Sequence, residues 1–244
     1  MRGPTHSAMA AVWLLFYSLA VPIGVAQSSA GTIRFIRAFV VDDRLSALRR
    51  EPDLRSRVVQ RLRIGREVFI YGLRSGKGGQ PDFYRVALSR RTRGWIHRSA
   101  VAVPNRSGED ERVLRLAEEA ENGFDRIVLC RLLSDHFKRS PLAALSLLRL
   151  AEEAERAAAS LSARARRRLS GIDKDGLNAR DYYLSDAGLD RYSRLGVGFD
   201  FDEAAARYVY DGQAYRDIIR RYPRTPEARI ARARLEARAG RPGQ

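Results

Sequence analysis

The sequence is short of the residues that most metal and thiol chemistry requires. Among its 244 residues there is one cysteine, and there are only three histidines. A single thiol cannot close an internal disulfide, and alone it cannot hold a structural zinc ion or an iron–sulfur cluster. Metal binding would have to use histidine and carboxylates, and histidine is nearly missing. We therefore expect no metal and no cofactor, and we identify no catalytic residue.

Lysine is also scarce, although the chain is strongly basic. The formal net charge is +16, and lysine supplies three of the 45 basic side chains, which leaves 42 arginines. Arginine grips phosphate in a bidentate fork, so this charge would suit a polyanion. A GC-rich genome also produces chains rich in arginine and alanine without selection for phosphate binding, and we favour that explanation. We do not expect nucleic acid as a partner.

Long apolar runs are missing after residue 26. Before it, Arg2 is followed by the uncharged apolar stretch 8–21 and by small residues that end at Ala26. This pattern is typical of a secretory signal peptide with cleavage after Ala26, and the alternative is an uncleaved anchor. We therefore predict an exported protein, periplasmic or extracellular, which is not an integral membrane protein once residues 1–26 are removed.

Residues 33–103 are rich in Val, Ile, Phe, Tyr and Arg, and Gly and Pro interrupt them at short intervals. Short runs of alternating polarity predict about five strands here. Tyr84 and Val86 fall on one face of such a strand, expected to be buried, while Phe83 and Arg85 fall on the other, expected to be wet. A small open sheet would leave an apolar face in water, so we expect a barrel or a sandwich.

Four segments of this region resemble the bacterial SH3-like domain. In chain order they are 48–52 (LRREP), 58–68 (VVQRLRIGREV), 83–86 (FYRV) and 94–97 (GWIH). Glu51 stands where the family usually has glycine. The resemblance implies a small SH3-like β-barrel over residues 33–104. It also implies a module that binds cell wall or peptide, as such domains of exported bacterial proteins usually do.

An SH3-like module of this kind would bind its ligand through aromatic and arginine side chains of the barrel. The candidate ligand-binding residues are Tyr71, Phe83, Arg85, Arg93 and Trp95. Trp95 has an alternative role as part of the core, because it lies on the strand that would close so small a barrel.

From residue 107 onward the apolar spacing becomes helical. Ser107 and Asp110 predict a capping box, and Ser140 followed by proline predicts a second helix start. Thr225 followed by proline predicts the start of a last helix, which continues towards Ala239. We therefore expect several helices that bury their apolar stripes against one another.

The segment 115–121 (RLAEEAE) recurs at 149–155, an offset of 34 residues, which is the period of tetratricopeptide repeats. The segment 214–228 resembles the second helix and the inter-repeat turn of tetratricopeptide-like envelope proteins. We predict an all-α, tetratricopeptide-like domain over 108–240, with a plain helical bundle as the alternative. The fold class is then α+β, a small SH3-like β-barrel followed by helices.

Several further residues allow a structural and a functional interpretation. Cys130 lies in 124–137, where apolar residues recur at helical spacing, so we expect a buried structural thiol. The acidic residues Asp200, Asp202 and Glu203 are expected to cap a helix. An aromatic stretch between residues 175 and 210 would either pack a core or form a partner surface. The candidates for partner binding are Tyr182, Tyr183 and Tyr192.

Together these patterns predict a non-enzymatic envelope protein that acts as an adaptor. One module would bind cell wall or peptide, and the helical module would bind a protein. Two alternatives remain. A cell-wall hydrolase of unrecognised type would need carboxylates that converge in a cleft, and a polyanion-binding basic protein would lose its affinity steeply with salt.

Overall fold

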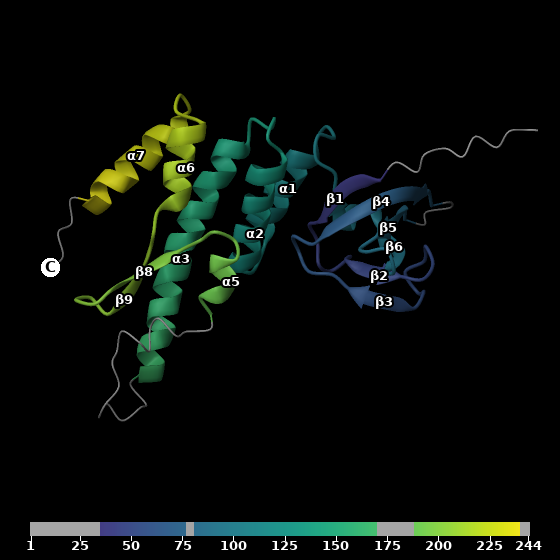
Figure 1. Ribbon diagram of the computed structural model, residues 1–244, viewed down its shortest axis with the longest axis horizontal. Helices are drawn as coiled ribbons and strands as arrows, with labels where there is room; N and C mark the ends of the chain where they lie inside the picture. The colour runs from purple at the N-terminus through teal and green to yellow at the C-terminus, as the bar shows by residue number, and fades with distance from the viewer. Residues whose placement is uncertain (1–34, 77–80, 170–187, 240–244) are drawn as a thin grey trace, which may run out of the picture. The chain divides into compact units, whose positions relative to one another are not determined.

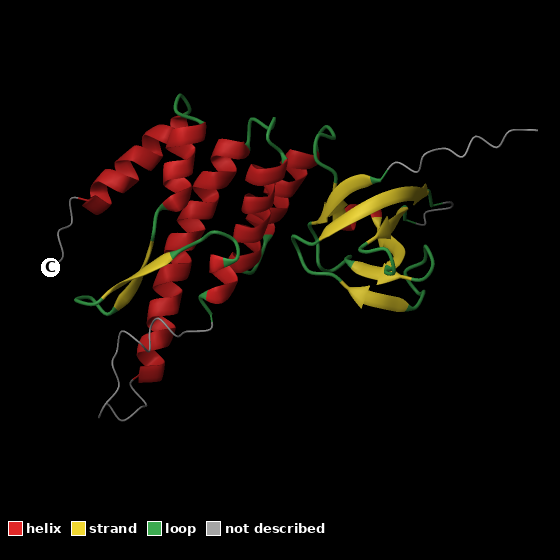
Figure 2. Ribbon diagram, viewed as in Figure 1, coloured by secondary structure: helices red, strands yellow, loops and turns green. Residues whose placement is uncertain are grey.

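The computed structural model describes residues 35–76, 81–169 and 188–239, which lie in a compact unit spanning Arg34–Gln244. Strands come first in the chain and helices follow, so the fold class is α+β (Figure 2). Within these ranges no helix combines the length and apolar character that crossing a membrane requires. The predicted signal peptide and the candidates Tyr182 and Tyr183 lie outside the described residues.

The N-terminal region is a seven-stranded sheet in which every pairing is antiparallel (Figure 1). The strands are β1 (Ile36–Val40), β2 (Ala47–Arg49), β3 (Val58–Arg61), β4 (Glu67–Arg74), β5 (Phe83–Ala87), β6 (Arg93–His97) and β7 (Val101–Ala102). Their order is β3-β2-β6-β5-β4-β1-β7. No pairing among the described strands joins β3 to β7, so the hydrogen-bonded sheet does not close into a ring.

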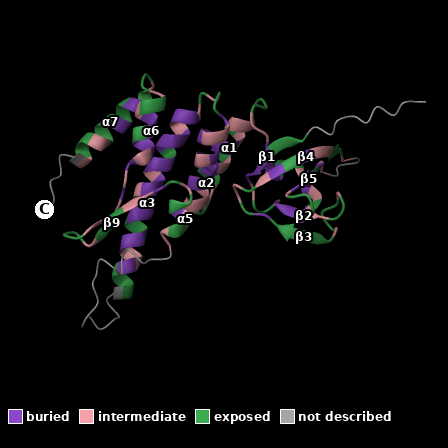
Figure 3. Cartoon of the chain, in the orientation of Figure 1, coloured by how far each residue is buried: buried purple, intermediate pink, exposed green. Residues whose placement is uncertain are grey.

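One face of this sheet carries the core that the alternating pattern predicts. Tyr84, Val86 and Ile96 are buried together with apolar residues of β1, β2 and β4. The other face is not uniformly wet, because Phe83 is only 2% exposed and Ala87 is also buried. The prediction of a wet face therefore holds for Arg85 and is wrong for Phe83. By contrast, every residue of β3 is exposed (Figure 3).

The C-terminal region consists of helices and one two-stranded hairpin (Figure 1). The 3₁₀ helix η1 (Arg98–Ala100) and β7 lead into it. The elements are α1 (Glu109–Glu119), α2 (Gly123–His136), α3 (Ala143–Leu169), α5 (Asp190–Ser193), β8 (Phe199–Asp202), β9 (Arg207–Tyr210), α6 (Gln213–Arg221) and α7 (Pro226–Ala239). α1 packs on α2 and α2 on α3, while α3 also contacts β9, α6 and α7.

The predicted helix starts are partly right. The Thr225 hydroxyl accepts a hydrogen bond from the Ala228 amide (3.3 Å), and α7 begins at Pro226 as expected. The Ser140 hydroxyl accepts one from the Leu142 amide (3.0 Å), just before α3. The capping box at Ser107 is wrong. The N-cap is Gly108, whose φ of 75° suits glycine, and no side chain caps α1.

The acidic residues Asp200, Asp202 and Glu203 do not begin a helix. The first two lie on β8, and Glu203 lies in the turn that follows. The Asp202 carboxylate accepts a hydrogen bond from the Ala205 amide (3.1 Å) and pairs with Arg207 (3.3 Å). These contacts stabilise the turn of a β-hairpin. Aspartate is common in turns as well as at helix caps, because its carboxylate accepts hydrogen bonds from nearby backbone amides.

The two copies of the repeated segment begin at the same distance from the first residue of their helices. Residues 115–121 begin at the seventh residue of α1, and residues 149–155 begin at the seventh residue of α3. The lengths then differ, because α1 has 11 residues and α3 has 27. The 34-residue offset is therefore an offset between helix starts, and it does not extend to helix ends.

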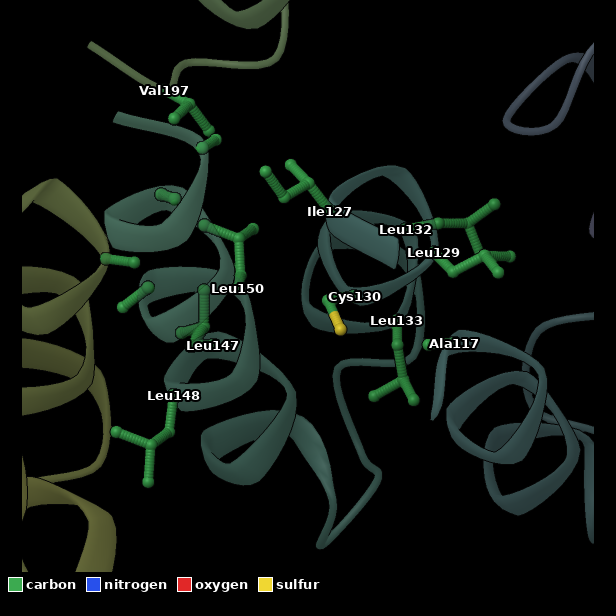
Figure 4. Close-up of a cluster of buried hydrophobic side chains, with 14 of the residues drawn as sticks. Ala117, Ile127, Leu129, Cys130, Leu132, Leu133, Leu147, Leu148, Leu150 and Val197 are labelled. Atoms are coloured by element: carbon green, nitrogen blue, oxygen red, sulfur yellow. The ribbon is translucent and has the colours of Figure 1, made fainter. Parts of the chain in front are cut away.

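Cys130 is a buried thiol of the helical core, as predicted. Its side chain is 1% exposed and lies among apolar residues of α1, α2 and α3 (Figure 4). Burial raises the pKa of the Cys130 thiol to about 12. The reactive thiolate form is therefore disfavoured at neutral pH.

Candidate functional site

Four of the five predicted ligand-binding residues meet on the face of the sheet opposite its core. They are Tyr71 on β4, Arg85 on β5, and Arg93 and Trp95 on β6. Phe35, just before β1, and Phe69 on β4 extend the same surface. We call these six residues the outer face: Phe35, Phe69, Tyr71, Arg85, Arg93 and Trp95.

Strand register explains why the outer-face residues come together. Arg85 lies directly opposite Trp95, and Ala87 lies between Phe69 and Arg93. Directly opposed side chains on one face of an antiparallel pair lie within about 5.5 Å of each other at Cβ. The outer face therefore forms two neighbouring rows that run across β4, β5 and β6.

A β-bulge in β4 adjusts this register at Tyr71. Ile70 pairs with Val86 and Gly72 pairs with Arg85, so Tyr71 is the extra residue. Bulges re-aim side chains and are frequent beside functional sites. A Cβ on Gly72 would lie only 3.2 Å from the Cβ of Arg85, so the glycine leaves room for the arginine.

The two arginines of the outer face lie over aromatic rings. The Arg85 guanidinium is 5.3 Å from the centre of the Tyr71 ring and 5.8 Å from that of Trp95. The Arg93 guanidinium is 5.8 Å from the Tyr71 ring centre. Such cation–π contacts contribute about 0.5–1 kcal/mol each at exposed sites, and they hold a guanidinium in place without using up its N–H donors.

Neither of these guanidiniums has an acidic partner among the described residues. Other arginines of the same region do have one, since Arg37 pairs with Glu67, Arg44 with Asp42 and Arg98 with Asp82. Arg85 and Arg93 are both exposed, so their donors face solvent. The outer face consequently concentrates positive charge that the neighbouring chain does not neutralise.

The Tyr71 hydroxyl adds a second unsatisfied polar group at the same place. It is buried, and none of the described residues forms a hydrogen bond with it. Leaving a buried hydroxyl unpaired costs about 1–3 kcal/mol. Phe35, whose ring centre is 5.7 Å from that of Tyr71, is 53% exposed, and Phe69 is 38% exposed. Apolar and cationic groups thus lie side by side on one surface, with the Tyr71 hydroxyl buried beside them.

Two predicted site residues are not available to a ligand. Phe83 is buried and packs edge-on against His97, with ring centres 5.7 Å apart, so its assignment to ligand binding is wrong. Tyr192 is 4% exposed and packs against Phe124 and Phe199. This tyrosine belongs to the helical core, and its assignment to a partner surface is wrong.

Sequence reasoning did not select Phe35 and Phe69, although a signal for Phe69 exists. In 67–71 (EVFIY) the residues Phe69 and Tyr71 alternate with Val68 and Ile70, which places the two rings on one face. Phe35 has no such signal, because its position depends on how β1 registers with β4.

A second feature is an acidic cavity of about 400 Å³ lined by loop residues after β1 and by residues of α1 and α2. Its carboxylates are Asp42, Asp43, Glu119, Glu121 and Asp125. Burial raises the pKa of Asp125, the neighbouring Asp43 raises it further, and Arg191 opposes both. Within the part of the chain that the structure describes, no group of three or more His, Cys, Asp or Glu side chains is placed to hold a metal ion.

Comparison with known protein families, with curated proteins and with solved structures finds no match to this chain.

Proposed function

We propose that this protein is a non-enzymatic, exported component of the bacterial envelope. In this proposal the sheet is an SH3-like module that binds cell wall or peptide through the outer face. The helices form a tetratricopeptide-like module that binds a protein partner. The protein acts as an adaptor between the two ligands.

The observation that carries the proposal is the outer face itself. Tyr71, Arg85, Arg93 and Trp95 were selected as ligand-binding residues on the basis of the SH3-like resemblance, and they form one cluster in which the arginines are exposed and the rings are half-buried. Aromatic and arginine side chains are enriched at binding hot spots. The exposed guanidiniums of the cluster have no acidic partner among the described residues, so their donors are available to a ligand.

Two further observations support the module assignments. The segments 83–86 and 94–97, which resemble SH3-like motifs, lie on the adjacent strands β5 and β6. In the helical region, the starts of α1 and α3 are 34 residues apart, and α2 packs between these two helices in sequence order. Stacking of helix pairs at a fixed offset is how helical repeats build a continuous core.

The test is co-sedimentation of the protein with purified peptidoglycan at low and at high salt. We expect binding that persists at high salt and is lost in a Trp95→Ala, Arg85→Gln variant whose circular dichroism matches the parent. Arg91→Gln serves as a matched control, because Arg91 is exposed in the turn before β6 and lies outside the outer face. Binding that salt alone abolishes would favour the polyanion-binding alternative.

The acidic cavity supports a second candidate, a cell-wall hydrolase. Glycoside hydrolysis uses one protonated and one ionised carboxyl group, and an environment that raises one carboxyl pKa is the usual device. In this reading Asp125 donates the proton and a second cavity carboxylate acts as the base. Release of soluble wall fragments by the protein, and its loss in Asp125→Asn, would support this function. If the unmodified protein releases no fragments, hydrolase activity on the cell wall tested is excluded.

A further inference from the structure

We infer that the outer face binds an acidic peptide segment in which a carboxylate side chain lies next to an apolar one. Arg85 and Arg93 would bind the carboxylate, and Phe35 and Phe69 would cover the apolar side chain. This inference rests on the proposed function, since it names the chemistry of the ligand at the same surface.

The charge of the outer face selects an anion. Two guanidiniums lie over one tyrosine ring, and no described carboxylate neutralises either of them. A guanidinium that stacks on a ring keeps its N–H edge free for a bidentate contact with a carboxylate. The Tyr71 ring is the shared contact of the two guanidiniums, so it holds both positive charges near one another.

The apolar part of the outer face favours a ligand that carries an apolar group beside its anionic group. Phe35 and Phe69 remain half exposed beside the arginines, on the β1 and β4 side of the surface. A phosphate or an acetate ion would neutralise the charge and leave both rings in water. Burying apolar surface contributes about 25 cal/mol per Å², so a ligand with an apolar group next to its anionic group gains additional affinity.

The dimensions of the sheet suit a short extended peptide. Neighbouring strands lie about 4.8 Å apart, so the distance from β1 to β6 across three strand spacings is about 14 Å. An extended peptide rises about 3.3 Å per residue, and its alternate side chains point to the same side about 7 Å apart. A peptide with an apolar residue two positions from an acidic one can therefore contact both halves of the outer face. Its apolar side chain lies against Phe35 and Phe69, and its carboxylate lies against Arg85 and Arg93.

Trp95 provides a direct readout of binding. The chain has two tryptophans, Trp13 and Trp95. Trp13→Phe leaves Trp95 as the only tryptophan of the 244-residue sequence, and removal of residues 1–26 would have the same result. The Arg85 guanidinium lies 5.8 Å from its ring centre. Movement of Arg85 towards a carboxylate changes the surroundings of the indole and hence its emission.

The experiment titrates the Trp13→Phe protein with acetyl-Leu-Ser-Glu-Ser-Leu-amide and follows the fluorescence. Three comparison probes are the same peptide with Gln for Glu, the same peptide with Ser for both Leu, and inorganic phosphate at equal ionic strength. We expect saturable binding of the first peptide and about tenfold weaker binding of the Gln peptide, the usual effect of losing a charged hydrogen-bond partner. The peptide with Ser for both Leu, and phosphate, should also bind more weakly.

Variants locate the site. Arg85→Gln and Arg93→Gln should each weaken the acidic peptide about tenfold and leave the affinity for the Gln peptide unchanged. Arg91→Gln removes the same charge from the turn before β6 and should leave both affinities unchanged. Equal binding of the Glu and Gln peptides, or equal weakening by Arg91→Gln, would overturn the inference. Phosphate that binds as tightly as the peptide would also overturn it, because the site would then be a general anion site.

This experiment separates the inference from the proposed function. If the acidic peptide binds the outer face while the protein does not sediment with peptidoglycan, the proposal of a cell-wall ligand is wrong and the inference stands. If the protein sediments with peptidoglycan through the outer face and the Glu and Gln peptides bind equally, the proposed function stands and the inference fails.

Discussion

Two arginines in different regions show how differently the same side chain is used. The Arg126 guanidinium, on α2, donates to the Ala117 carbonyl (3.1 Å), the Ala120 carbonyl (2.6 Å) and the Glu153 carboxylate (2.7 Å). These contacts tie the C-terminal end of α1 to α3. Arg85, on the sheet, lies over two aromatic rings, and none of the described residues offers it a carboxylate.

The two arginines differ in how many of their N–H donors remain available to a ligand. Arg126 has its donors engaged by carbonyls that α1 cannot satisfy itself, because the last carbonyls of a helix have no partner within it. Arg85 is held by ring contacts, which leave its donors free. A net charge of +16 therefore describes the composition of the chain and does not measure how many arginines can bind an anion.

The strongest test of the helical region uses its single thiol. Cys130 is buried in the core that Arg126 helps to hold together, and its pKa is raised to about 12. We expect a thiol reagent at pH 8 to label it at least about a thousandfold more slowly than the urea-unfolded chain, because labelling requires opening of the core. Labelling at the rate of the unfolded chain would show that this core is open in solution.

Removal of Arg126 should have the next largest effect. Arg126→Met leaves two carbonyls without a partner, and it leaves Glu153, whose side chain is 8% exposed, with Arg156 alone. We expect a loss of about 3 kcal/mol in the free energy of unfolding, measured by urea denaturation.

A matched control for this variant is Arg149→Met, which removes an exposed pair with Glu152 (3.0 Å). Exposed pairs of this kind contribute about 0.5 kcal/mol or less. If both variants lose the same stability, the hydrogen bonds of Arg126 do not hold α1 to α3.

The outer-face arginines should contribute less to stability. Replacing both Arg85 and Arg93 with Gln removes three cation–π contacts of about 0.5 kcal/mol each at these exposed positions, which is about 1.5 kcal/mol in total. We expect the free energy of unfolding to fall by about half as much as in Arg126→Met, although ligand binding is lost. A loss as large as that of Arg126→Met would remove the contrast between the two regions, because these arginines would then be structural.

The smallest expected effect is a pH dependence from His136, whose ring stacks on Phe39 with ring centres 4.0 Å apart. Burial lowers the pKa of His136, and the nearby Arg37 lowers it further. The folded state thus holds the proton less tightly than the unfolded state, where the histidine pKa is about 6.5. Stability is full above that pH and falls below it, because the unfolded state is protonated first.

His136→Phe keeps a ring against Phe39 and removes the titration. We expect this variant to lose less stability between pH 7 and pH 5 than the parent chain, as measured by the urea midpoint at each pH. His97, whose pKa is also lowered by burial, is present in both proteins and does not affect the comparison. An identical change in midpoint would show that His136 does not titrate with folding.

Much of the sheet and of its outer face could be predicted from the sequence, because strand alternation assigns side chains to faces. This reasoning placed Arg85 correctly, and it failed for Phe83 because alternation does not say what else covers a face. The bulge at Tyr71 was not predictable, since an extra residue in a strand leaves no mark in composition.

Local signals were less reliable in the helical region, because the same residue types serve several structures. Ser107 fits a capping box, yet Gly108 in a left-handed conformation forms the N-cap. Asp202 fits a helix start and instead stabilises a hairpin turn. Proline is more specific, since its fixed φ suits the first turn of a helix, and Pro226 was placed correctly.

The unequal lengths of α1 and α3 give the two helices different partners. α1 has 11 residues and packs on α2, whereas α3 has 27 residues and also contacts β9, α6 and α7. In the later turns of α3 the Ser162 hydroxyl accepts a hydrogen bond from the Tyr208 amide (2.8 Å) of β9. The additional turns of α3 therefore carry the hairpin, a contact for which a helix of the length of α1 would be too short.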